Sequence, residues 1–127
     1  IWSPMHMKKF TIYLKSWRTW LFLGYLSLVM YLSLTSGSEL SWFSKLWRYD
    51  KIVHFTEYLG VGFLMINMLK IQPMNKSHWR FALIFLLLFP LFDEFIQYYT
   101  PTRIPDIYDG ICDICGGFVG AYIRKII

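Results

Sequence analysis

Four stretches of this chain contain no Asp, Glu, Lys or Arg, and they limit what it can fold into. The first, residues 19–38, has twenty residues, enough for a helix to cross a hydrocarbon core of about 30 Å at about 1.5 Å per residue. The other three, residues 58–69, 81–92 and 114–123, have only ten to twelve residues. Each reaches a spanning length of about 17–25 residues only by extending, in one direction, through charged positions.

This pattern predicts an all-α, polytopic membrane protein with four transmembrane helices at about residues 17–36, 51–71, 79–99 and 105–126. Because a bilayer offers the backbone no hydrogen-bond partners, helices are the economical way for such apolar runs to cross it. The composition agrees, since 56% of the residues are hydrophobic and the mean hydropathy is +0.40, above ordinary soluble usage.

The length of 127 residues allows one small domain. His6-Met7 is what a common cloning site encodes at a start codon, so residues 1–6 are predicted to be an expression-tag remnant and residues 7–127 a single domain. Cys112 and Cys115 are too few for a disulfide framework. We expect small buried thiols in the last helix rather than a redox or zinc half-site.

Charged residues divide unequally between the two sides of such a bundle. Nine basic residues fall on the side of both termini and four on the other, so the positive-inside rule places both termini in the cytoplasm. We expect no nucleic-acid binding, since the basic residues are spread over several cytoplasmic segments. All eight acidic residues fall on the outer side: Glu39, Asp50, Glu57, Asp93, Glu94, Asp106, Asp109 and Asp113.

The first outer loop carries large apolar residues at helical spacing, including Trp42, Leu46 and Trp47. This spacing predicts a short helix at residues 40–48 that lies in the outer interface as an anchor. The alternative is a lid over a site.

Three of the predicted helices carry a polar stripe confined to their outer end, at about 100° per residue. A charge near the bilayer centre costs about 2.5–3.5 kcal/mol, so we expect the stripes to turn inward and meet in a hydrated pocket open to the outside. Asp93, about 100° from Glu94, is expected to point elsewhere. We predict catalytic roles for His54, Glu57, Glu94, Asp109 and Asp113, and ligand-binding roles for Asp50, Lys51, Gln97, Arg103 and Asp106.

A structural alternative stays open for some of these residues, and so does the chemistry. Asp106 and Asp109 follow Pro105 in a first helical turn, where acids favour the helix dipole. Histidine and carboxylates can do acid–base work or hold a divalent metal. Arg103 could grip a phosphate beside the start of the last helix, and the nearby acids favour a metal-bridged phosphate over a bare one.

Two stretches of the sequence resemble a known family. DKIVHFTEYLG begins Asp-Lys and places His three residues after the Lys, and DEFIQYYTPTRIPDIYDGICDICGGFVG carries Glu-x-x-Gln, Pro-x-Arg, an Asp six residues later and a glycine-bearing helix. In this order they resemble the VanZ-like proteins, over about residues 50–120. The family's polar positions fall on Asp50, Lys51, His54, Glu94, Gln97, Arg103 and Asp109. The family usually has Asn where this chain has Asp113.

The resemblance implies a small multi-pass protein of the bacterial cytoplasmic membrane, associated with glycopeptide (teicoplanin) resistance. From the site we expect a hydrolase or transferase acting on an envelope lipid or a lipid-linked cell-wall precursor. The alternative is a module that binds or senses a glycopeptide, a lipid headgroup or a partner protein without chemistry. A transporter is less favoured, since four short helices make a small one unless it oligomerises, and no broken, inverted pair of helices is evident.

Overall fold

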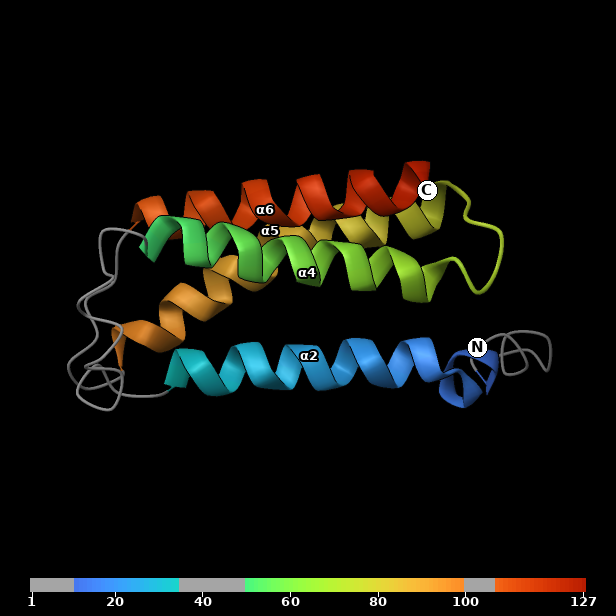
Figure 1. Ribbon diagram of the computed structural model, residues 1–127, viewed down its shortest axis with the longest axis horizontal. Helices are drawn as coiled ribbons and strands as arrows, with labels where there is room; N and C mark the ends of the chain where they lie inside the picture. Colours follow the sequence, from blue (N-terminus) through green and yellow to red (C-terminus); the bar gives the residue numbers. More distant parts are fainter. Residues whose placement is uncertain (1–10, 35–49, 100–106) are drawn as a thin grey trace.

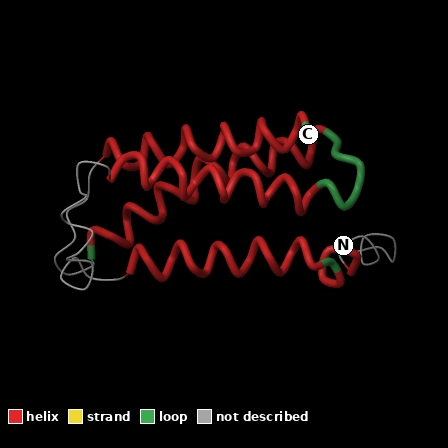
Figure 2. Tube along the Cα trace, viewed as in Figure 1, coloured by secondary structure: helices red, strands yellow, loops and turns green. Residues whose placement is uncertain are grey.

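The computed structural model describes residues 11–34, 50–99 and 107–127, except the side chains of residues 32–34, 50, 51, 53, 97 and 107. In these ranges every regular element is a helix (Figure 2). A short helical segment at residues 11–15 is followed by four longer helices: α2 (Trp17–Leu34), α4 (Asp50–Leu69), α5 (Lys76–Tyr98) and α6 (Ile107–Ile126).

The four long helices confirm the all-α prediction for the described part of the chain, and their bounds lie within a few residues of those predicted. The largest difference is at α5, which begins at Lys76 because Asn75 caps it. The Asn75 side chain accepts a hydrogen bond from the backbone N–H of His78 (3.1 Å), and the His78 ring accepts one from the backbone N–H of Asn75 (3.2 Å). This is a capping box with histidine in the usual place of glutamate.

The helices form an antiparallel bundle (Figure 1). The N-terminal ends of α4 and α6 lie at the same end of the molecule as the C-terminal ends of α2 and α5. The helix α6 packs closely along α4, while α5 diverges from that pair toward α2. The predicted interfacial helix at residues 40–48 lies outside the described residues.

Glycines allow the backbones of α4 and α6 to touch. A Cβ added to Gly116 would collide with the carbonyl oxygen of Phe55, and one added to Gly120 would collide with that of Leu59. On the facing helix, Gly62 lies equally close to the backbone of α6. Small residues at this spacing let two helices approach more closely than larger side chains allow. The glycine face of α6 therefore serves close packing against α4.

Each of the three clustered helices has a buried stripe that ends in polar residues at the same end of the bundle. In α4 the stripe begins with His54 and continues through Tyr58, Val61 and Met65, at spacings of four, three and four residues. Corresponding stripes run along the other two helices: Ala82, Leu86, Pro90 and Asp93 in α5, and Asp109, Asp113, Gly117 and Ala121 in α6.

The opposite end of the bundle is held by basic side chains. The Arg124 guanidinium donates to the side-chain oxygen of Asn67 (3.0 Å), and Arg18 donates to the Asn67 backbone carbonyl (3.3 Å). The Lys70 ammonium donates to the carbonyl of Arg124 (2.8 Å). Asn67 thus links α2, α4 and α6.

The outer faces of the helices are strongly apolar. Leu88 and Phe92 of α5 are more than half exposed, as are Trp20 and Tyr31 of α2, whereas Asp113 is fully buried. Within the described ranges, however, no helix has both the length and the sustained apolarity needed to span a bilayer. The four-helix prediction is confirmed as a fold, and the crossing of a membrane stays a prediction.

Candidate polar site

His54 lies at the centre of a buried polar cluster that three helices build. It occupies the second turn of α4, on the buried stripe of that helix, and only 6% of its surface is exposed. Phe55, the next residue, is the one whose backbone touches Gly116 of α6. The close glycine packing therefore brings the start of α6 within hydrogen-bond distance of the histidine.

Two aspartates of α6 contact the imidazole on its two nitrogen atoms. Nδ1 of His54 lies 2.8 Å from Oδ1 of Asp113, a hydrogen bond between two buried side chains. Nε2 lies 3.6 Å from Oδ2 of Asp109. Asp109 and Asp113 are four residues apart, so one face of α6 presents both carboxylates to the same ring.

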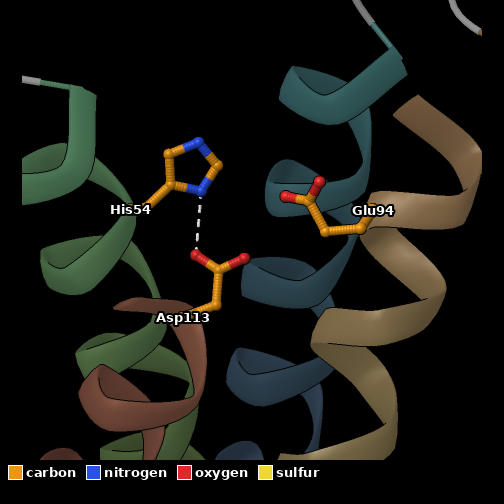
Figure 3. Close-up of side chains that lie close together, drawn as sticks. All are labelled: His54, Glu94 and Asp113. Atoms are coloured by element: carbon orange, nitrogen blue, oxygen red, sulfur yellow. Dashed lines mark hydrogen bonds and ion pairs between the residues drawn. The ribbon is translucent and has the colours of Figure 1, made fainter. Parts of the chain in front are cut away.

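Glu94 of α5 completes the cluster from the opposite side (Figure 3). One ligand atom from each of His54, Glu94 and Asp113 lies within 4.8 Å of the other two. Figure 3 shows the Glu94 carboxylate directed toward the space beside the His54–Asp113 pair. The structure thus brings together four of the predicted catalytic residues, counting Asp109.

Asp93 and Tyr58 form a second buried pair next to this cluster. The Tyr58 hydroxyl donates to Oδ2 of Asp93 (2.6 Å), and both residues are almost fully buried. Asp93 also acts electrostatically on Asp113. The expectation that Asp93 points elsewhere is therefore wrong. The signal that could have identified it is the line Ala82, Leu86, Pro90, Asp93, whose spacings of four, four and three residues place Asp93 on the face of α5 turned inward.

Tyr58→Phe is expected to lower the free energy of unfolding by about 1.5–3 kcal/mol, since it leaves a buried carboxylate without its donor. Tyr25→Phe is the matched comparison, because the Tyr25 hydroxyl donates to a neutral group, the backbone carbonyl of Glu57 (2.6 Å). That change is expected to cost about 0.5–1.5 kcal/mol. Thermal unfolding in detergent, followed by circular dichroism, measures both. Equal losses of unfolding free energy in the two variants would mean that the hydrogen bond from Tyr58 to the Asp93 carboxylate is no stronger than one to a neutral carbonyl.

The other predicted site residues fall into two sets. One residue lies outside the group of His54, Glu94 and Asp113, and the predictions for the rest concern parts of the chain that are not described. Glu57 is half-buried and follows His54 by one turn, but its carboxylate is not part of the group of candidate ligands found among the described residues. Asp50 and Lys51 open α4 and Gln97 lies in α5, and the predictions for their side chains fall outside the description. The predictions for Arg103 and Asp106 concern residues that are themselves outside it.

The two cysteines differ in exposure. Neither forms a disulfide bond; Cys112 is half-buried and Cys115 is exposed on α6. The prediction of two buried thiols is thus wrong for Cys115, because α6 turns its glycine face to α4 and residue 115 away from it. Neither cysteine belongs to the polar cluster.

The cluster holds more acid than its one histidine can balance. The carboxylates of Glu94, Asp109 and Asp113 lie around a single imidazole, and Asp93 acts electrostatically on Asp113. Oδ2 of Asp113 and Oδ1 of Asp93 have no hydrogen-bond partner among the described residues. Burying an ion costs several kcal/mol, and the cost for several carboxylates is offset only if protons or cations neutralise part of their negative charge. Such an arrangement can accept and donate protons, or bind a cation.

Comparison with known proteins supports the resemblance seen in the sequence. Searches of curated proteins and of solved structures returned no match. The model of one protein family, described as VanZ/LLP1, matches residues 4–127, which is nearly the whole chain. The chain belongs to the VanZ/LLP1 family.

Proposed function

We propose that this protein is an integral membrane enzyme of the bacterial envelope. It hydrolyses or transfers a group on an envelope lipid at the polar cluster of His54, Glu94, Asp109 and Asp113. The observation that carries this proposal is the buried imidazole between two carboxylates, faced by a third from another helix. Perturbed, buried ionisable groups gathered at one point are more typical of reaction centres than of cores.

The distribution of residues supports a position in the membrane. The apolar outer faces and the buried acids reverse the usual arrangement of a water-soluble protein, in which acids are almost never fully buried. Contiguous exposed apolar surface of this extent suits lipid. With the exception of Lys51, the described basic residues lie at the end of the bundle away from the cluster. Because basic residues favour the cytoplasmic side of a membrane, this distribution supports cytoplasmic termini and a site near the outer face.

A groove on α5 supports a lipid as the substrate. It has a volume of about 300 Å³, and its lining is almost wholly apolar. Its lining reaches Phe92 near the C-terminal end of α5, so an acyl or prenyl chain lying in it would extend toward the end of the bundle that carries the cluster. The groove is lined by Phe81, Ile84, Phe85, Leu88, Phe89 and Phe92.

The reaction follows from the groups present. For hydrolysis, a water attacks the phosphorus or carbonyl carbon of the headgroup while a group of the cluster takes its proton. The bond to the leaving oxygen then breaks, and the proton passes to that oxygen. For transfer, the hydroxyl of a second substrate replaces the water. General acid–base catalysis of this kind contributes about 10²–10⁴-fold in rate.

Glu94→Gln tests this function, because it removes one charge of the cluster with little change in shape. Purified protein in mixed micelles is assayed with a polyisoprenyl diphosphate and with phosphatidate, and released phosphate is measured. The variant is expected to turn over at least about 100-fold more slowly than the wild type. His78→Gln, at the far end of α5, is expected to leave turnover unchanged.

Two results would contradict the proposal. Unchanged turnover in Glu94→Gln would remove this cluster as the reaction centre. Tight binding of lipid or of teicoplanin by the wild type, with no product from any substrate, would instead favour a module that binds or senses a glycopeptide, a lipid headgroup or a partner protein.

A further inference from the structure

We infer that His54, Glu94 and Asp113 form a binding site for one divalent first-row metal ion, zinc or manganese. The inference concerns the same cluster as the proposed reaction but does not depend on that reaction, because it rests on the geometry and charge of the side chains. One imidazole nitrogen with two carboxylates is a ligand set that suits these ions.

The three candidate ligand atoms have suitable separations. Zinc binds nitrogen and oxygen at about 2.0–2.2 Å, so two ligand atoms of one tetrahedral ion lie about 3.4 Å apart. The Nδ1–Oδ1 distance between His54 and Asp113 is 2.8 Å, and all three ligand atoms lie within 4.8 Å of one another. A small inward movement of the Glu94 side chain, the least buried of the three, would close the set around an ion.

An unpaired oxygen points to a ligand at this place. Asp113 is fully buried, and its Oδ2 has no hydrogen-bond partner among the residues described, although leaving a buried acceptor unsatisfied is costly. Figure 3 shows this oxygen on the side of Asp113 that faces Glu94. A cation between them would satisfy the oxygen and offset the excess negative charge of the cluster.

The second nitrogen of the histidine faces a carboxylate, the kind of group with which metal-binding histidines pair. A histidine that binds a metal through one ring nitrogen almost always donates its other N–H to a carboxylate, a carbonyl or water, which fixes its tautomer and orientation. Here Nε2 of His54 faces Oδ2 of Asp109 at 3.6 Å, while Nδ1 faces the space shared with Asp113 and Glu94. Asp109 is thus a positioning residue for the ligand His54.

A bound ion would also define the chemistry of the cluster. Three protein ligands leave a fourth position for water, which is the pattern of catalytic rather than structural zinc sites. A bound ion would supply a Lewis acid held by His54, Glu94 and Asp113, while Asp109 would orient the His54 ring and Asp93 would keep its hydrogen bond from Tyr58.

Metal content measured without substrate tests the inference. The full chain, freed of any affinity tag, is stripped with a chelator in detergent, then titrated separately with zinc and with manganese chloride. Elemental analysis after gel filtration is expected to give one ion per chain for the wild type. Glu94→Gln and His54→Gln are expected to bind the ion at least about 100-fold more weakly than the wild type. His78→Gln, a histidine change at the other end of the bundle, is expected to bind it with the affinity of the wild type.

Thermal unfolding of the wild type with and without metal provides a second measurement, and it does not require any variant to fold normally. Saturating metal is expected to raise the unfolding temperature of the wild type, because an ion that binds only the folded state stabilises it. The same metal is expected to have no effect on Glu94→Gln. A wild type that retains neither ion, or a His54→Gln variant that binds as tightly as the wild type, would overturn the metal site.

The two proposals can fail separately. Stoichiometric metal binding without turnover would leave the metal site standing and remove the proposed enzyme. Turnover by a wild type that retains neither ion would leave the proposed enzyme standing and remove the metal site.

Discussion

Gly120→Ala is expected to lower the free energy of unfolding by at least about 3 kcal/mol, the upper part of the range for overpacked interiors. The added methyl group would collide with the backbone carbonyl oxygen of Leu59 and lie against the backbone of Phe63. Backbone atoms cannot move aside as a side chain can, so α4 and α6 would have to separate along their length. Thermal unfolding in detergent, followed by circular dichroism, measures the loss.

Gly24→Ala is the matched control, since it makes the same chemical change in a helix. Gly24 is exposed on α2, and a Cβ there would meet no atom within 4 Å. Alanine is the better helix former by about 0.5–1 kcal/mol, so this variant is expected to be as stable as the wild type or slightly more stable. If Gly120→Ala proved as stable as Gly24→Ala, the described contact between α4 and α6 would be incorrect.

The same interface determines the geometry of the site. Gly116 lies one turn after Asp113, and it touches the backbone of Phe55, which follows His54. Widening this contact by the thickness of a methyl group would break the 2.8 Å hydrogen bond between His54 and Asp113. The polar cluster can therefore form only when the glycine face of α6 packs against α4.

The sequence predicted the helices well, because their signals are local. Uninterrupted apolar runs, and the charges that bound them, locate α2, α4, α5 and α6 to within a few residues. It missed the early start of α5, because the cap at Asn75 uses the ring of His78 where a capping box usually has Glu or Gln.

The site was predicted only in part, because the rotation of each helix about its axis is set by packing. His54 and Glu57 lie about 60° apart on α4, too close for periodicity to separate them. Glycine contacts with α6 select the line through His54 and Tyr58 as the buried one. Similarly, Asp93 and Glu94 point about 100° apart, yet both are turned inward: Asp93 accepts the hydrogen bond from Tyr58 of α4, and Glu94 lies beside His54 and Asp113.

His54→Gln is expected to reduce turnover of the lipid substrate by about 10³–10⁴-fold, the largest catalytic effect of any single change in the cluster. Whether the imidazole carries a proton or binds a metal, no other described residue of the cluster can replace it, since its neighbours are all carboxylates. Glutamine retains a donor for Asp113, so the fold is expected to survive. Phosphate release and thermal unfolding, measured on the same preparation, separate the two effects.

Asp113→Asn distinguishes a chemical role of the cluster from a purely structural one. The amide offers both an oxygen and an N–H to Nδ1 of His54, so either tautomer of the ring keeps a hydrogen bond, and the change removes a fully buried charge. We therefore expect a smaller loss of turnover, about 10–100-fold, with stability unchanged or raised, because burying an ion is costly. If His54→Gln and Asp113→Asn instead both destabilised the protein while turnover per folded molecule stayed constant, the cluster would be a structural ion pair and the reaction would occur elsewhere.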